Sequence, residues 1–232
     1  MIRVTENFRK IQDLLTRAST EAGRPQGSVQ LLAVSKGQQP AAVLEAVSVG
    51  QRAFGENFVQ EALGKIAAVA RDDLSWHFIG HLQSNKTRQV AEHFQWVHTV
   101  DRLKIAERLS RQRPHYADDL NVCIQVMIDP EDDKSGVTPD DLPDLARAVS
   151  SLPKLKLRGL MCIPAPREGF EAQRAPFRRL RLLSENLSAA GIETNTLSMG
   201  MSDDYRAAIH EGATLVRIGT ALFGPRHEGS AR

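Results

Sequence analysis

Eight short apolar segments, each followed by residues with helical spacing, constrain the fold of this 232-residue chain more than any other feature. The apolar segments are typical of strands buried on both faces, and the residues between them repeat apolar side chains every three or four positions. The segments begin near residues 31, 52, 76, 96, 122, 157, 196 and 214. Eight strands that alternate with helices over about 200 residues predict a single closed, TIM-like (β/α)8 barrel.

An extra helix is expected before the first strand, because Val4, Phe8, Ile11 and Leu15 recur on one helical face and residues 23–27 then end the pattern. The competing architecture is an open doubly wound sheet. Against it, no Gly-x-Gly-x-x-Gly sequence follows the first strand. We expect one domain over residues 1–226, with the barrel closing at its end, and a polar tail over residues 227–232.

The composition of the chain indicates which kinds of partner and which compartment to expect. The formal net charge of +2 provides no strong field to attract nucleic acid or a membrane surface, and we expect neither as a partner. The first residues lack the apolar core of a signal peptide, and no apolar run approaches the ~20 residues of a membrane span. Cys123 and Cys162 each lie in an apolar run, as buried cysteines do in a reducing compartment. These observations predict a cytoplasmic protein.

The first strand ends in a lysine that is a candidate reactive group. Residues 31–37 read Leu-Leu-Ala-Val-Ser-Lys-Gly, and strand alternation puts Lys36 on the side of Leu32 and Val34. An amine that points inward at the end of a strand loses solvation, which disfavours its charged form and suits it to Schiff-base chemistry. The alternative is a solvated surface lysine that merely ends the strand.

The loops after the last two strands have the composition of a phosphate site. Gly200 permits close approach of the backbone to an anion, and Ser202 is expected to cap the next helix and to donate a hydrogen bond. Gly219 and Thr220 offer consecutive N–H groups and a hydroxyl. Barrels frequently bind phosphate between these two loops. The alternative is a glycine-rich turn with a capping serine.

A ligand with an aldehyde at one end and a phosphate at the other fits these two features, and pyridoxal 5'-phosphate (PLP) is such a ligand. Alternation in the last strand places Arg217 inward. Because a guanidinium only donates hydrogen bonds, Arg217 beside the pyridine nitrogen would leave that nitrogen unprotonated and the ring a weaker electron sink. The alternative for Arg217 is an ion pair that closes the barrel.

Several motifs together resemble the pyridoxal phosphate homeostasis protein family, over about residues 5–226. The matching blocks are residues 33–36, 55–57, 77–86, 159–164, 197–205 and 216–224. The resemblance implies the alanine racemase N-terminal barrel fold, with Lys36 holding PLP as an internal aldimine and Arg217 at the pyridine nitrogen. It implies phosphate contacts from Ser202, Gly219 and Thr220. It implies a pocket lined by Asn57 and Ser198.

One block departs from the family pattern. After the fifth strand the family has an Asn-Ile pair, an acidic stretch and Lys-Ser-Gly. This chain has Gln-Val-Met-Ile-Asp-Pro over residues 125–130, and it keeps Lys-Ser-Gly over residues 134–136. The departure affects one wall of the expected pocket.

Three functions stay open. The first is a PLP-binding protein that is not an enzyme: a monomeric carrier, without strong catalytic activity, that buffers the cofactor or delivers it to apo-PLP enzymes. The second is a PLP-dependent amino-acid racemase, which needs a second base that only Tyr116 or Tyr205 offers among the tyrosines. The third is a barrel enzyme that acts on a phosphorylated sugar or carboxylate with the Lys36 amine. A zinc pair at His77 and His81 is disfavoured, because the segment reads as strand and then loop.

Overall fold

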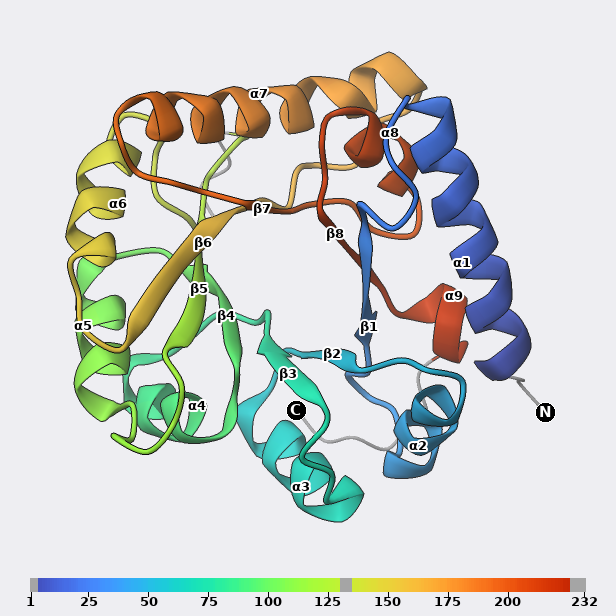
Figure 1. Cartoon of the computed structure of the whole chain (residues 1–232), viewed down its shortest axis with the longest axis horizontal. Helices are drawn as coiled ribbons and strands as arrows, with labels where there is room; N and C mark the ends of the chain where they lie inside the picture. Colours follow the sequence, from blue (N-terminus) through green and yellow to red (C-terminus); the bar gives the residue numbers. More distant parts are fainter. Residues whose placement is uncertain (1–3, 130–134, 226–232) are drawn as a thin grey trace.

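The chain forms a closed barrel of eight parallel strands, which confirms the predicted fold class (Figure 1). The computed structural model describes residues 4–129 and 135–225. Each strand pairs with the next in the sequence, and the last pairs with the first through Leu32 opposite Arg217. The strands are β1 (Gln30–Val34), β2 (Ala53–Glu56), β3 (Ser75–Phe78), β4 (Trp96–Val100), β5 (Leu120–Gln125), β6 (Leu155–Met161), β7 (Thr196–Ser198) and β8 (Leu215–Ile218).

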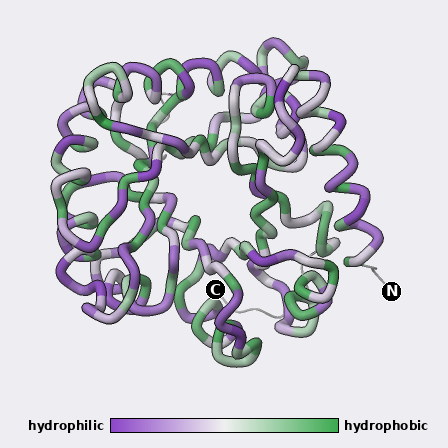
Figure 2. Tube along the Cα trace, in the orientation of Figure 1, coloured by the Kyte–Doolittle hydropathy of each residue, from purple (hydrophilic) through white to green (hydrophobic). Residues whose placement is uncertain are grey.

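Helices surround the barrel, and bands of hydrophobic and hydrophilic residues alternate along them (Figure 2). This alternation is expected of helices that pack one face on the strands and expose the other. The helices are α1 (Val4–Glu21), α2 (Pro40–Ser48), α3 (Val59–Val69), α4 (Thr87–His93), α5 (Leu103–Gln112), α6 (Leu142–Ser150), α7 (Phe170–Ala189), α8 (Tyr205–His210) and α9 (Thr220–Phe223), and a short 3-10 turn, η1 (Ser84–Lys86), precedes α4.

Alternate residues of β1 pack on opposite sides of the barrel wall, as the sequence pattern predicts. Leu31 and Ala33 belong to the large hydrophobic core beneath the helices. Leu32 and Val34 belong to a small separate cluster with Ile79 and Leu215. Because Leu32 and Val34 face the interior of the barrel, the wall carries a second, inner layer of side chains on which polar groups can be built.

The predicted extra helix is α1, and it packs across the point where the barrel closes. Its apolar face buries Val4, Ile11 and Leu15, and its amide side chain at Asn7 donates to the Leu222 carbonyl of α9 at 3.0 Å. Figure 1 shows α1 beside α9 and α8. The first and last helices of the described chain therefore support each other.

The fifth strand ends before its apolar run does. Regular pairing of β5 stops at Gln125, although the apolar run continues to Ile128. The Met127 N–H bonds to the Val137 carbonyl at 2.9 Å, so this segment folds against the loop that follows it. Lys134 and the expected tail over residues 227–232 lie outside the described residues. None of the helices described is long and apolar enough to cross a membrane.

Candidate functional site

The seven residues predicted to bind the cofactor lie at the carboxyl ends of four neighbouring strands. Two of these strands, β8 and β1, are paired directly, with β7 and β2 on either side of them. This end of a parallel barrel is where ligands bind, so the closed fold brings candidates from both ends of the sequence to one arc. The residues are Lys36 after β1, Asn57 after β2, Ser198 and Ser202 at and after β7, and Arg217, Gly219 and Thr220 in and after β8.

Lys36 lies two residues beyond the end of β1 and is half-buried. The next residue, Gly37, has a φ of +70°, a left-handed conformation that glycine adopts without steric cost. The Gly37 N–H donates to the Glu61 carboxylate of α3 at 2.5 Å. A helix outside the barrel thus holds the turn of residues 35–37, which we call the Lys36 turn.

A buried ionic cluster, formed by Ser35, Glu56, Glu61 and Lys65, supports this turn. The Lys65 ammonium is only 3% exposed and donates to the Ser35 carbonyl at 2.6 Å, to Glu56 at 2.5 Å and to Glu61 at 3.0 Å. An ammonium has three donors, and these contacts occupy all of them. Lys65 is therefore a structural cation and offers no amine for reaction.

Glu56 is the most enclosed member of the ionic cluster. One carboxylate oxygen accepts from the Ser35 hydroxyl at 2.5 Å and from Lys65, and the other oxygen is buried without a partner among the described residues. Burial raises the pKa of Glu56 even though the Lys65 ammonium and the Ser35 hydroxyl oppose that shift. The cluster is tightly bonded but costly to bury.

On the other side of the arc, Arg217 is 5% exposed and is held by neutral acceptors. One terminal nitrogen donates to the Ser198 carbonyl at 2.6 Å and to the Ser198 hydroxyl at 3.0 Å, and the other donates to the Cys162 carbonyl at 2.9 Å. A guanidinium has five N–H donors. Among the described residues, two of those five have no partner, so Arg217 can donate to a ligand.

A chain of hydrogen bonds leads from Arg217 through the barrel interior. Ser198 contacts His98 at 2.8 Å between Oγ and Nδ1, and His98 contacts His77 at 2.9 Å between Nε2 and Nδ1. His77 in turn contacts the Ser75 hydroxyl at 3.0 Å through its Nε2. We call Ser75, His77, His98, Ser198 and Arg217 the histidine chain.

Burial keeps the histidine chain neutral except at Arg217. Loss of solvation lowers the pKa of His77 to about 3 and lowers the pKa of His98 well below its ordinary value, with smaller contributions at His98 from His77 and Arg217. Burial also raises the pKa values of Cys123 and Cys162 to about 12, so neither thiol is a nucleophile at neutral pH.

The loops after β7 and β8 lie against each other. The Arg217 N–H donates to the Gly200 carbonyl at 3.0 Å. Gly200 has a φ of +92°, and a Cβ there would stand 2.6 Å from the Ala208 Cβ. A Cβ on Gly219 would stand 3.0 Å from the Val34 carbonyl oxygen, so the β8 loop closes tightly on the end of β1. These contacts require glycine at position 200 and favour it at position 219.

The predicted capping role of Ser202 is wrong. Helix α8 begins at Tyr205, and the residue before it is Asp204, whose carboxylate accepts from the Met201 N–H at 2.6 Å. An aspartate at this place accepts from the turn more strongly than a serine hydroxyl does. Ser202 is half-buried within the turn, and Thr220 is exposed at the start of α9. Their predicted phosphate contacts remain predictions.

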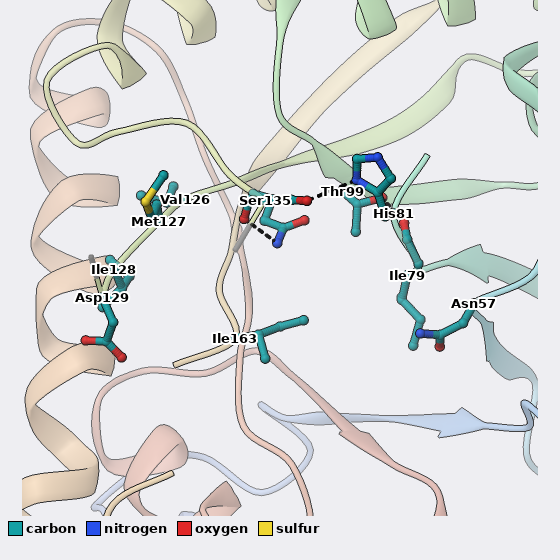
Figure 3. Close-up of a pocket in the computed structure, with 12 residues that line it drawn as sticks. Asn57, Ile79, His81, Thr99, Val126, Met127, Ile128, Asp129, Ser135 and Ile163 are labelled. Atoms are coloured by element: carbon teal, nitrogen blue, oxygen red, sulfur yellow. Dashed lines mark hydrogen bonds between the residues drawn. The ribbon is translucent and has the colours of Figure 1, made fainter. Parts of the chain in front are cut away.

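A pocket of about 230 Å³ opens at the same end of the barrel, beside the arc (Figure 3). Asn57 lines it with a side-chain oxygen that is buried and has no partner among the described residues. Ser135 bonds to His81 at 3.0 Å across the pocket rim, as Figure 3 shows. The other lining residues come mainly from the loops after β3 to β6 and include Ile79, Thr99, Gln125, Asp129 and Ile163.

Asp129, which the sequence places after the fifth strand, is engaged by Arg167. The two side chains form a paired contact with distances of 2.6 and 2.9 Å, and the Ala165 N–H adds a third bond at 2.8 Å. The hydrogen bonds from Arg167 hold the pKa of Asp129 below its ordinary value, although burial opposes them. A carboxylate held in this way is a wall of the pocket and not a base.

Sequence reasoning missed both supporting networks. The sequence gives no signal for a role of His98, and His77 enters the sequence analysis only as a disfavoured zinc ligand with His81. In the structure His77 bonds to His98 and His81 bonds to Ser135. Within the described residues, no group of three or more His, Cys, Asp or Glu side chains could hold a metal ion. The signal that could have found the ionic cluster is Glu56, a charged residue in a strand that needs a buried partner.

Comparison with known proteins gives a consistent result. A family model described as "Alanine racemase, N-terminal domain" matches residues 4–227. The "Pyridoxal phosphate homeostasis protein" of Pseudomonas aeruginosa is 57% identical over 230 residues, covering 99% of each chain.

Two solved structures have folds similar to that of this chain. PipY of Synechococcus elongatus, in a structure described as having PLP bound, is 40% identical with a TM-score of 0.82, over 95% of this chain and all of that one. Alanine racemase from Corynebacterium glutamicum is 16% identical with a TM-score of 0.70, over 99% of this chain but 62% of that one. At that identity the alanine racemase match speaks for the fold alone.

Proposed function

We propose that this chain, which belongs to the pyridoxal phosphate homeostasis protein family, binds pyridoxal 5'-phosphate and buffers it or delivers it to other proteins. In this proposal Lys36 holds the cofactor as a Schiff base and Arg217 faces its pyridine nitrogen. Ser202, Gly219 and Thr220 bind the phosphate, and Asn57 and Ser198 line the pocket. The named relatives and the PLP-bound PipY structure support the cofactor, and the site geometry supports the residue roles.

The residues at the arc fit this cofactor chemically. PLP carries an aldehyde, a ring nitrogen, a ring hydroxyl and a phosphate, and its protein partner is a lysine amine. Lys36 supplies a half-buried amine, and Arg217 supplies N–H donors that have no partner among the described residues. The unpartnered oxygen of Asn57 can accept a hydrogen bond from a ligand hydroxyl. The close approach of Gly219 to β1 leaves backbone, and no side chain, beside an anion.

The observation that carries the proposal is the pairing of β1 with β8. This pairing places the Lys36 turn and the Arg217–Thr220 segment on adjacent strands. One ligand can therefore contact an amine and a donor-only guanidinium at once. A phosphorylated-sugar enzyme needs the amine and the phosphate site but gives no role to Arg217.

The positions of the two tyrosines favour a carrier over a racemase, because neither can act as a second base opposite Lys36. Racemisation needs a base on each face of the ligand. Tyr116 is 80% exposed in the loop that leads into the amino end of β5, which is the opposite end of the barrel from the site. Tyr205 is half-buried at the start of α8, and burial raises its pKa further above neutrality. Neither tyrosine suits a second base at Lys36.

The first experiment is the visible absorption spectrum of the purified protein, before and after borohydride. The proposal expects a band that PLP produces on a lysine, lost on reduction and absent from Lys36→Ala. Lys104→Ala, which removes an exposed lysine of α5, is the matched control and should keep the band. A wild-type protein that stays colourless with added PLP would overturn the proposal and favour the phosphorylated-sugar enzyme.

A second experiment separates carrier from racemase. PLP-loaded protein is mixed with an apo-PLP enzyme, whose recovered activity measures transfer, and separately with an L-amino acid, whose conversion to the D-form measures racemisation. The proposal expects transfer without steady turnover. Turnover that depends on Lys36 would support the racemase instead.

A further inference from the structure

The hydrogen bonds of the histidine chain run in one direction, which follows from the chemistry of its two ends. Arg217 can only donate, so the Ser198 hydroxyl oxygen accepts from it at 3.0 Å. The hydroxyl hydrogen of Ser198 then needs an acceptor of its own. Among the described residues, the one acceptor in contact with this hydroxyl is Nδ1 of His98, at 2.8 Å.

That donation fixes both histidine tautomers. A neutral His98 that accepts at Nδ1 carries its hydrogen on Nε2 and donates to Nδ1 of His77 at 2.9 Å. His77 then carries its hydrogen on Nε2 and donates to the Ser75 hydroxyl at 3.0 Å. The order of donors is Arg217, Ser198, His98 and His77, with Ser75 as the final acceptor.

The opposite direction of these hydrogen bonds is disfavoured, because it would leave a buried hydroxyl hydrogen without an acceptor. If His98 donated from Nδ1, Ser198 would accept twice, and its own hydrogen would have no acceptor in a fully buried position. In the favoured direction the leftover hydrogen belongs to Ser75, which is half-buried at the amino end of β3. The unpaired group thus lies at the end of the chain where solvent can reach it.

We propose that His98 is a positioning residue for Arg217 and that it holds the guanidinium through the Ser198 hydroxyl. The effect of His98 on ligand binding rests on the proposed function, in which Arg217 faces the ring nitrogen of PLP. With its hydrogen directed at His98, Ser198 turns a lone pair to Arg217. That lone pair and the two carbonyls fix the guanidinium and leave its remaining N–H groups for the ligand. Because the chain begins at a donor-only group, it orients Arg217 and carries no proton to the ligand.

The tautomers can be read without any cofactor. Nitrogen NMR of the full-length, PLP-free protein between pH 6 and 8 should show His77 and His98 as neutral rings, both with hydrogen on Nε2. Arg217→Met removes the group that sets the direction, so His98 should become a mixture of the two tautomers. An Nδ1–H form of His98 in the wild-type protein, or no change in Arg217→Met, would overturn the proposal.

The positioning role is tested by PLP titration of His98→Phe. We expect about tenfold weaker binding and a shift of the absorption maximum of bound PLP, with Ser198→Ala changing both in the same direction. Leu32→Val is the matched control, because it trims the inner barrel layer without touching a hydrogen bond and should leave the absorption maximum unchanged. An unchanged maximum in both His98→Phe and Ser198→Ala would overturn the proposal.

The two failures are distinguishable. If the wild-type protein does not bind PLP, the proposed function fails, and the NMR comparison of wild type with Arg217→Met still decides whether Arg217 sets the direction of the chain. If PLP binds but the tautomers or the spectra behave otherwise, only the role of His98 fails.

Discussion

The two sides of the arc each present one cation but support it in opposite ways. The Lys36 turn rests on charges: two carboxylates and one ammonium in the ionic cluster. Arg217 rests on neutral groups: two carbonyls and a hydroxyl backed by two neutral histidines. Counting Lys36 with the ionic cluster, positive and negative side chains balance on that side. No carboxylate hydrogen-bonds to Arg217 among the described residues, although Asp204 in the loop after β7 lies close enough to act on its charge.

The ionic cluster and the histidine chain should also lose stability under different conditions. A buried ion pair is destabilising to break, because the survivor stays buried and unpaired. A neutral chain has no such charge to expose, but it loses stability when its histidines are forced to protonate. The ionic side should therefore be sensitive to substitution and the neutral side to acid.

Lys65→Met should give the largest effect. It leaves Glu56 buried beside Glu61 without a cation and should lower the free energy of unfolding by about 3–5 kcal/mol, measured by urea denaturation at pH 7. The double variant Glu56→Gln with Lys65→Met should recover a large part of that loss. A loss under about 1 kcal/mol in the single variant would remove the contrast between the two sides.

Lowering the pH should destabilise the protein through the histidine chain, which supports Arg217 with neutral groups. The folded pKa of His77, about 3, lies below the ordinary value of 6.5, so between these values the unfolded chain binds more protons than the folded one. Stability is then fully present above pH 6.5 and falls as the pH drops toward 3. The contribution of His77 is a loss of about 2 kcal/mol between pH 6.5 and 5.

Denaturation of wild type and His77→Phe at several pH values checks this expectation, since the free energy of unfolding should decline less steeply with falling pH in the variant. Equal slopes of this free energy against pH in the two proteins would show that protonation of His77 does not cause the loss of stability in acid.

Glu56 has a pH dependence of the opposite sign. Because its pKa is raised in the folded state, its contribution to the free energy of unfolding falls as the pH rises above 4.5 toward the folded pKa.

Arg217→Lys sharpens the comparison at the ligand. The variant keeps a positive charge but loses the planar fork that bonds to Ser198 and Cys162 together. We expect PLP affinity to fall about tenfold, or about 1.4 kcal/mol, by absorbance titration. Unchanged affinity would mean that charge alone is needed on the β8 side.

Gly219→Ala should give the smallest effect. The added Cβ lies 3.0 Å from the Val34 carbonyl, so the loop must shift by a few tenths of an ångström. PLP affinity should fall about fivefold, or about 1 kcal/mol, while pyridoxal without phosphate binds as before. Gly64→Ala in α3, where a Cβ meets open space, is the matched control. An equal loss for pyridoxal would place the effect outside the phosphate contact.

The architecture and the arc could be predicted from local pattern. The alternation of Leu32 and Val34 predicts a strand, the recurrence of Ile11 and Leu15 predicts a helix, and parallel barrels bind ligands at one known end. That rule is enough to place Lys36, Arg217 and Gly219 at the same end of the barrel from the sequence alone.

The supports could not be predicted, because each joins residues whose contact depends on three-dimensional packing. His98 and Ser198 are 100 residues apart, and nothing in either segment indicates the other. Lys65 lies on the buried face of α3 with Ala62 and Val69, but lysine is a residue type that is usually solvated, and only the folded barrel supplies the carboxylates that pair with it. The turn before α8 shows a nearer limit, since Ser202 and Asp204 are both good capping residues and local sequence does not choose between them.

The closure of β8 on β1 has a consequence for synthesis of the protein. The Lys36 turn leaves the ribosome early, but β8, the strand that completes the arc, lies about 180 residues later, and α9 after it is held by α1 through Asn7. A nascent chain cut before Arg217 would hold the amine without its partner strand. If Lys36 and Arg217 bind PLP together, capture of the ligand would report that β8 has been made and has paired with β1, and the bound ligand would stabilise the closed barrel.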